Sequence, residues 1–269
     1  MDIKSEIVRL SEKEKYDFYD LCSIVRILRS DLGCPWDREQ THKSVRMALI
    51  EETYEAAEAI DNDDPHLMRE ELGDVMLQIL FHAEMERETG RFDIGDVVND
   101  ISAKMVKRHP HVFFNEIAEN SDKVIENWEK IKNKEKKRES ATSRLTAVPK
   151  TYPALMRAQS VSSRAAKVKF DFPSAEEAKD KILEELKEIE SADGKDMIFE
   201  ESGDLLFSVV NYLRKMGVNS EEALIHATDK FISRFEKMEK SIEEKGKKVE
   251  MCTLKELEKT WNFIKIDKK

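Results

Sequence analysis

The chain has 269 residues, of which 38% are charged, and its formal net charge is -10 at pH 7. That acidity disfavours a bulk nucleic-acid binder, because duplex affinity comes largely from Lys and Arg on phosphates. The three cysteines show no paired spacing, which argues against a disulfide framework or a zinc site. No apolar run approaches the length of a membrane span, so we expect a soluble, cytoplasmic protein.

Composition and hydrophobic pattern predict an all-α protein, with four helices in the first half. Gly and Pro are scarce, at 8 and 6 residues. Apolar residues recur at helical spacing over about 14–32, and an amphipathic helix is expected over about 44–60. A third helix, over about 65–88, is apolar on nearly all sides after Asp74, so we expect it at the centre of a bundle. A fourth, over about 94–108, ends before Pro110.

The second half repeats this plan after a charged connection. Residues of about 119–140 carry mixed charges with little to bury, which indicates an exposed helix and linker. Residues 141–153 contain two prolines and suit an extended connection. Further helices are expected over about 174–191, 196–216, 220–245 and 253–263. The predicted organisation is an N-terminal domain, 1–118, a charged helix and linker, 119–150, and a C-terminal domain, 151–269.

One pattern of carboxylates occurs twice, once in each half. The first copy is Glu51-Glu52-x-x-Glu55 followed by Glu71-x-x-Asp74, and the second is Glu184-Glu185-x-x-Glu188 followed by Glu201-x-x-Asp204. Residues three or four apart share one face of a helix. Four such carboxylates from two facing helices would hold a hard cation, and Mg²⁺ held this way usually binds phosphates.

Each motif taken alone has a plainer explanation. In a chain this rich in charge, a single Glu-x-x-Glu is most often a solvated helix face. Glu71 with Asp74, and Glu201 with Asp204, however, stand at the head of otherwise apolar helices, where unpaired carboxylates are costly. The repeated set therefore favours a cation site. Because histidine is absent from both sets, Mg²⁺ or Mn²⁺ is preferred over the iron of a di-iron bundle.

The repeat extends to a pair of basic residues. Lys104-x-x-x-Arg108 in the first half matches Lys230-x-x-x-Arg234 in the second, and each pair shares one helical face. Such a pair commonly decorates an exposed surface, but its repetition at matched positions raises its significance. Together with the carboxylates, the pairs predict a site for a metal and a phosphate-bearing ligand.

In this order, the motifs resemble the MazG family of nucleoside triphosphate pyrophosphohydrolases over nearly the whole chain. Besides the carboxylate blocks, the resemblance rests on Cys34-Pro35-Trp36-Asp37-x-x-Gln40-Thr41-His42, Arg108-His109-Pro110-His111-Val112-Phe113, and Val148-Pro149 leading to Pro153-Ala154-Leu155-x-Arg157-Ala158. One departure is Lys169-Phe170-Asp171-Phe172, where the family tends to have Gly-Phe-Asp-Trp.

The resemblance implies a fold and an activity. The fold is two tandem four-helix-bundle-like domains, intertwined in a homodimer. The activity is hydrolysis of nucleoside triphosphates, ribo and deoxy and broad in range, to the monophosphate and pyrophosphate. The implied cofactor is Mg²⁺, for which Mn²⁺ is a substitute.

The resemblance also implies a set of site residues, with the second domain as the main catalytic unit. The implied catalytic residues are Glu184, Glu185, Glu188, Glu201 and Asp204, the last four being metal ligands. The implied nucleotide contacts are Lys181, Glu184, Glu200, Lys230, Arg234 and Trp261. The matching metal set of the first domain is Glu52, Glu55, Glu71 and Asp74, with Lys104 and Arg108 on the phosphates. Since all four carboxylates are present there, a second working site remains open.

The charges suggest a mechanism and leave two alternative functions. The cation lowers the pKa of a bound water, Glu184 or Glu185 orients that water as base, and the basic pair stabilises the departing pyrophosphate. One alternative is a regulatory scaffold that binds nucleotides or a partner without turnover, although a scaffold needs no repeated carboxylate sets. The other is a selective house-cleaning enzyme for dUTP, dCTP or oxidised nucleotides. Pocket shape around Trp36 and Trp261 would decide that selectivity.

Overall fold

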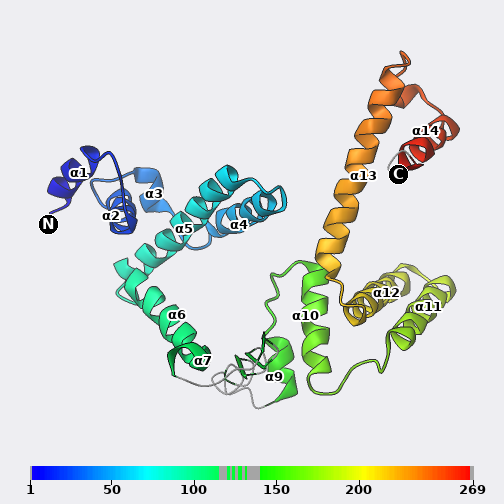
Figure 1. The fold of residues 1–269 in the computed structure, drawn as a ribbon, viewed down its shortest axis with the longest axis horizontal. Helices are drawn as coiled ribbons and strands as arrows, with labels where there is room; N and C mark the ends of the chain where they lie inside the picture. The colour runs from blue at the N-terminus through cyan, green and yellow to red at the C-terminus, as the bar shows by residue number, and fades with distance from the viewer. Residues whose placement is uncertain are drawn as a thin grey trace. The chain divides into compact units, whose positions relative to one another are not determined.

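A computed structural model describes residues 2–114, 120–121, 123–124, 127–128, 131 and 140–266. Every regular element in these ranges is helical, which confirms the all-α class (Figure 1). No helix among the described residues is long and apolar enough to cross a membrane. The chain divides into two compact units, residues 1–132 and 133–269. Most of the exposed helix expected over 119–140 lies outside the described residues.

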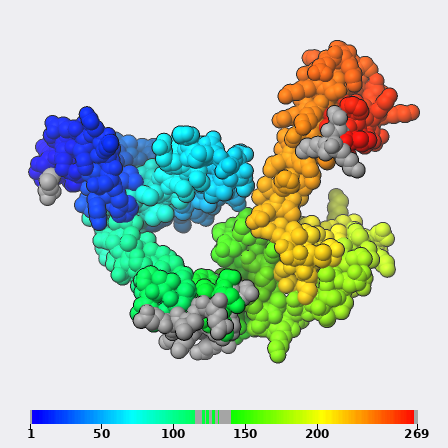
Figure 2. Space-filling view, in the orientation of Figure 1, coloured from blue at the N-terminus to red at the C-terminus, as the bar shows by residue number. Residues whose placement is uncertain are grey.

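The first unit is organised around a hairpin of two long helices. Its described helices are α1 (Ile3–Ser11), α2 (Phe18–Leu28), α3 (Pro35–Glu39), α4 (Arg46–Asp61), α5 (Pro65–Glu88), α6 (Ile94–Arg108) and α7 (Pro110–Phe113). The carboxylate of Asp64 caps α5 by accepting from the backbone N–H groups of His66 and Leu67, and Pro65 occupies its first position. This cap places α5 directly against α4, and their side chains fill the space between them (Figure 2).

The core of the first unit lies at the C-terminal half of α5. Val25 of α2 packs there with Val45, which precedes α4, and with Leu80, Phe81 and Met85 of α5. Burying each of these side chains stabilises the unit by roughly 1.5–3 kcal/mol. The N-terminal half of α5 is less covered, because its apolar side chains at positions 72 and 76 are exposed. The central position expected for this helix therefore describes its C-terminal half alone.

A buried arginine fixes the loop between α2 and α4. The guanidinium of Arg29 donates to both carboxylate oxygens of Glu88 at the end of α5, over 2.7 and 2.8 Å. It also donates to the backbone carbonyls of Asp37, over 2.7 Å, and Gln40, over 3.2 Å. The short helix α3 is thereby attached to α5, and it presents Trp36 with 64% of its surface exposed.

The second unit contains a matching hairpin. Its described elements are α9 (Ala141–Thr146), α10 (Ala154–Ala166), α11 (Ala175–Ser191), α12 (Lys195–Lys215), α13 (Ser220–Glu243), η1 (Val249–Met251) and α14 (Leu254–Ile266). Helices α11 and α12 pack side by side, α10 lies against α12, and α14 lies against α13 (Figure 1). Val210 of α12 and Ala178 of α11 are almost fully buried.

The loop after α10 is clamped onto the end of α12. Asp171 forms an ion pair with Arg214 and a second with Lys215, whose Nζ lies 3.3 Å away. Lys215 also donates to the carbonyl of Phe172 over 2.8 Å. These bonds hold the pKa of Asp171 below its usual range, chiefly through Arg214. Lys169 has a positive φ of 66°, so it stands in the left-handed conformation that glycine adopts most easily. That geometry explains why a glycine suits this position in the family pattern.

The expected helices are largely present. The bounds of α5 and α6 agree with those expected, whereas α2 begins later, at Phe18, because Asp17 caps it. Helices α1 and α10, and the short helices α3 and α7, had no counterpart in the sequence interpretation. The expectation of an extended connection over 141–153 was wrong for its first part, where Ser140 caps the short helix α9.

The loop geometry gives a stability prediction. Replacing Lys169 by glycine should raise the free energy of unfolding by roughly 0.5–1 kcal/mol, because relief of the left-handed strain exceeds the added chain entropy. Urea denaturation measures the change. Lys237→Gly, in an exposed turn of α13, is the control and should cost about 1 kcal/mol. Equal losses in the two variants would contradict the assigned backbone conformation.

Candidate functional site

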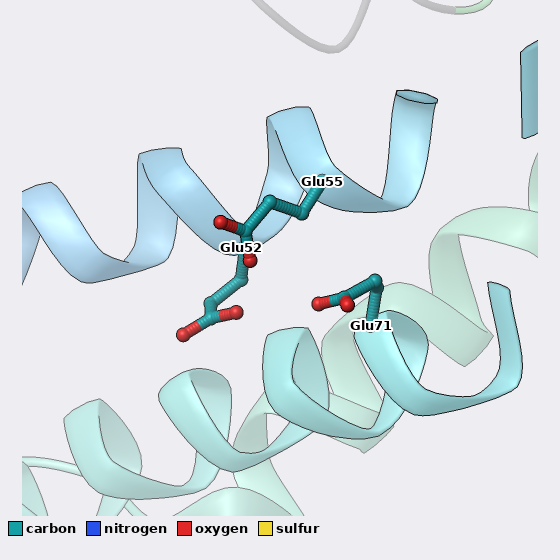
Figure 3. Close-up of side chains that lie close together, drawn as sticks. All are labelled: Glu52, Glu55 and Glu71. Atoms are coloured by element: carbon teal, nitrogen blue, oxygen red, sulfur yellow. The ribbon is translucent and has the colours of Figure 1, made fainter. Parts of the chain in front are cut away.

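Three carboxylates of the first unit meet between α4 and α5. Glu52 and Glu55 project from α4 and Glu71 projects from α5, all into the gap between these helices (Figure 3). One oxygen atom from each lies within 4.8 Å of the others. Asp74, predicted as a fourth member, is half-buried on the next turn of α5 and lies outside this close group among the described residues. The hairpin therefore gathers three of the four predicted oxygens.

The carboxylates of this group repel one another. Burial is the largest cause that raises the pKa of Glu71, and the negative charge of Glu55 adds to it. The pKa of Glu52 is raised in the same way, by burial and then by the charge of Asp74. A charge pattern of this kind stabilises a cation placed between the oxygens.

The second unit forms the equivalent group between α11 and α12. Glu185, which is only 3% exposed, offers one oxygen within 4.8 Å of oxygens from Glu201 and Asp204. Glu188, one turn along α11, is half-buried, and the neighbouring Glu185 carboxyl raises the pKa of Glu188. Glu184 and Glu200 are exposed beside the group.

A lysine distinguishes the second group from the first. The Nζ of Lys181 lies 2.8 Å from an oxygen of Glu184 and 2.8 Å from Oε1 of Glu185. This contact lowers the pKa of Glu185 and raises that of Lys181. Four residues before Glu52, the corresponding position of the first unit holds Ala48. The first group therefore lacks the cation that partly neutralises the second.

One buried atom shows that the second group suits a cation. Oε2 of Glu185 is buried and has no hydrogen-bond partner among the described residues. Leaving a charged acceptor without a partner is costly, and such atoms usually have a proton, a donor or a metal beside them. Three converging carboxylates without histidine or cysteine are the donor set of a hard divalent cation.

The predicted phosphate-binding residues lie on other helices. Lys230 is exposed on α13, and Arg234, one turn later, has a buried Nε with no partner among the described residues. The ring of Trp261 on α14 lies 5.0 Å from that of Phe231, so this tryptophan stands beside the basic pair. Within the described residues these three form no bond with the carboxylate group.

The corresponding pair of the first unit is also separate from its carboxylates. Lys104 is exposed on α6 and forms no ion pair with a described residue. Arg108 is buried, and its guanidinium carbon lies 5.2 Å from the centre of the Trp128 ring. Each hairpin thus brings its own carboxylates together, whereas the predicted phosphate-binding residues lie on helices outside the hairpins.

Sequence reasoning missed a cavity that adjoins the second group. A cavity of about 660 Å³ is bordered by Lys181, Glu185 and Asp204 and continues to the clamped loop after α10. The departure from the family pattern at residues 169–172 marked this loop, but the cavity depends on contacts between segments more than forty residues apart.

Comparisons with known proteins decide the family. Residues 40–113 match the MazG nucleotide pyrophosphohydrolase domain. The chain is 44% identical to the nucleoside triphosphate pyrophosphohydrolase/pyrophosphatase MazG of Thermotoga maritima, over 92% of this chain and 95% of the relative. The chain belongs to the MazG family. The resemblance inferred from the motifs is thereby confirmed, and the family is one of hydrolases.

Two further relatives of this MazG chain differ in length. The nucleoside triphosphate pyrophosphohydrolase of Escherichia coli K12 is 39% identical over 91% of this chain and 95% of its own length. An uncharacterised protein of Bacillus subtilis, YabN, is 43% identical over 93% of this chain, which spans 52% of that protein. The matched stretch therefore covers most of both units of this chain, in a relative of similar length and in a longer one.

The different electrostatics of the two groups give a test in the absence of metal. The raised pKa of Glu71 means that its contribution to stability is present below its unfolded pKa and is lost as pH rises through its folded pKa. Glu71→Gln should therefore raise the melting temperature at pH 8 in chelator, and the gain should vanish near pH 4.

Glu185→Gln is the matched change in the second group and should have the opposite effect. It removes a carboxylate whose pKa is lowered by Lys181, so the melting temperature should fall at pH 8. Calorimetry of both variants checks the pair of predictions. A change of the same sign in both would contradict the assigned difference between the groups.

Proposed function

We propose that this chain hydrolyses ribo- and deoxyribonucleoside triphosphates to the monophosphate and pyrophosphate at the α11–α12 carboxylate group. The observation that carries the proposal is the convergence of oxygens from Glu185, Glu201 and Asp204 within 4.8 Å, together with the buried Oε2 of Glu185, which has no partner among the described residues. The names of two relatives that match over most of this chain support the same activity. A scaffold that only binds would need no such group.

The donor set supports Mg²⁺, or Mn²⁺ in its place. We propose that Glu185, Glu201 and Asp204 hold the ion, with Glu188 completing the set from the next turn of α11. When bound, the ion would neutralise phosphate charge and activate a water molecule. The acidic chain requires this countercharge, since a triphosphate brings about four negative charges. In the first unit Glu52, Glu55, Glu71 and Asp74 are the corresponding ligands.

The surrounding residues supply the remaining roles. Since Glu185 belongs to the cation group, we propose its exposed neighbour Glu184 as the base that orients the attacking water. Lys181 contacts both of these carboxylates, so its ammonium group is placed to meet phosphate oxygens that approach them. Glu200 lies exposed at the same end of α12.

The basic residues on α13 are proposed to stabilise the departing pyrophosphate. Lys230 and Arg234 would take its oxygens, and Trp261 beside them would contact the nucleotide. That role requires α13 to lie over an α11–α12 hairpin, either its own or that of a second copy. Lys104 and Arg108 on α6 would serve the first unit in the same way.

We further propose that the protein is a homodimer. The chain exposes 19883 Å², whereas two separate compact domains of half its mass would expose roughly 14,500 Å². Exposed apolar side chains follow one face of α12, including Phe199 and Leu206, seven residues apart. On α5, Met76 is 43% exposed and could contribute to such a face, whereas Leu80 is buried in the core of its own unit. A second copy covering these faces would complete each bundle.

The dimer prediction is tested at α12. Leu206→Glu should convert the protein from twice the mass of one chain to a single chain, because it places a charge in the apolar face. Light scattering after size exclusion measures the mass. Leu254→Glu, at an exposed leucine of α14, is the control and should leave the mass unchanged. A wild-type mass equal to one chain would contradict the proposal.

The activity is tested with separate variants of the two groups. Wild type should release pyrophosphate and monophosphate from nucleoside triphosphates with Mg²⁺, and Glu201→Gln should reduce the rate at least about 100-fold. Glu71→Gln, the matched change in the first unit, should retain the wild-type rate if only the second unit works.

Equal partial losses in the two variants would show that both groups are active. No metal-dependent release from any triphosphate would contradict the proposed function.

A further inference from the structure

The cavity beside the second carboxylate group has a wall that the proposed chemistry does not use. Its far part is formed by Phe170 and Phe172 of the clamped loop and by Phe207, Ser208 and Asn211 of α12. Asn211 lies seven residues after Asp204, which is two helical turns or about 10 Å along α12. That span is comparable with the separation of the α-phosphate and the base edge in an extended nucleotide.

The wall combines aromatic surface with unused polar groups. Phe170 is 81% exposed at the rim, although it precedes a residue that is firmly held. Asn211, only 6% exposed, donates to the Phe207 carbonyl over 3.3 Å and accepts from Arg214 over 3.2 Å. An amide has two donors and two acceptor sites, so one of each remains. Ser208, which is 5% exposed, borders the same part of the cavity.

One arginine connects both sides of this wall. Arg214 pairs with Asp171 in the loop and donates to the side chain of Asn211 on its own helix. The aromatic side of the cavity and its amide are therefore fixed to the same cation. This arrangement places aromatic side chains and an amide with a remaining donor and acceptor along the same cavity, which suits recognition of a flat heterocycle.

In the described part of the first unit, an apolar aromatic side chain occupies the position that matches Asn211. With Gly73 aligned to Gly203, Asn211 corresponds to Phe81 and Ser208 corresponds to Gln78. Phe81 is packed into the core with Val25, Val45, Leu80 and Met85. The carboxylates are repeated in both units, but among the described residues the amide of Asn211 is replaced by a core phenylalanine in the first unit.

We propose that this cavity is the nucleobase subsite of the second unit. The base stacks on Phe170, the remaining donor and acceptor of Asn211 read its hydrogen-bonding edge, and Asp171 positions the aromatic wall through Arg214. Base selectivity then resides at α12 and the clamped loop rather than at Trp36 or Trp261. This assignment rests on the proposed hydrolysis at the adjacent carboxylate group.

The test compares natural nucleotides with a substrate that has no base. Rates of pyrophosphate release are measured for ATP, GTP, CTP, UTP and ribose 5-triphosphate, with Mg²⁺, as functions of substrate concentration. Phe170→Ala should raise KM about tenfold or more for the four nucleotides, because stacking on an aromatic side chain is lost. Phe170→Ala should leave the KM for ribose 5-triphosphate unchanged. Phe263→Ala, at an exposed phenylalanine of α14, is the control. It should change neither the KM for the four nucleotides nor the KM for ribose 5-triphosphate.

A second variant tests whether Asn211 forms hydrogen bonds with the edge of the base. Asn211→Asp keeps the shape and the acceptor for Arg214 but replaces the amide donor with an acceptor, so the bond to the Phe207 carbonyl is lost as well. The ratios of kcat/KM among the four bases should change at least about tenfold, with the rate on ribose 5-triphosphate preserved.

Two results would overturn the subsite. One is an equal loss of kcat/KM on all five substrates in these variants, which would indicate a structural role. The other is unchanged KM values and base ratios in both variants. Absence of hydrolysis by wild type is a separate outcome, since it would refute the proposed function itself.

Discussion

The cost of holding several carboxylates together between two helices is the constraint on which the rest of this structure depends. In both hairpins, oxygens from three acidic side chains approach within 4.8 Å. Like charges at such distances are unfavourable, and burial makes them more so. The short caps and turns that bring α4 to α5 and α11 to α12 therefore maintain an arrangement that a cation would relieve. The carboxylate groups therefore lower the stability of the fold at the place where function is expected, as is common in active sites.

The surroundings of the carboxylate groups differ between the two units. In the second, Lys181 partly neutralises Glu184 and Glu185, and a cavity extends from the group to the clamped loop. In the first, Ala48 replaces the lysine, the pKa values of Glu52 and Glu71 are raised, and Phe81 is used for the core. A duplicated hairpin has thus kept its acidic residues in both copies while the surroundings diverged. Those surroundings favour the second unit as the place of nucleotide recognition.

The sequence predicted what depends on local spacing. Helix periodicity placed Glu71 and Asp74, or Glu201 and Asp204, on one face, and the hairpins followed from the turns between apolar segments. The departure from the family pattern at residues 169–172 marked the loop, but the left-handed backbone of Lys169 was not predicted. What could not be predicted depends on long-range packing. The approach of Asp171 to Arg214 spans 43 residues, and the exclusion of Asp74 from the close group depends on how α4 and α5 are rotated.

Anomalous diffraction from crystals grown with Mn²⁺ and a non-hydrolysable nucleotide tests the central claim most directly. Mn²⁺ is a suitable probe because it shares the oxygen ligands of Mg²⁺. The account predicts a peak within bonding distance of Glu185, Glu201 and Asp204, with phosphate oxygens on its open side. An ordered ion bound elsewhere, with these three carboxylates left unligated beside the nucleotide, would contradict it.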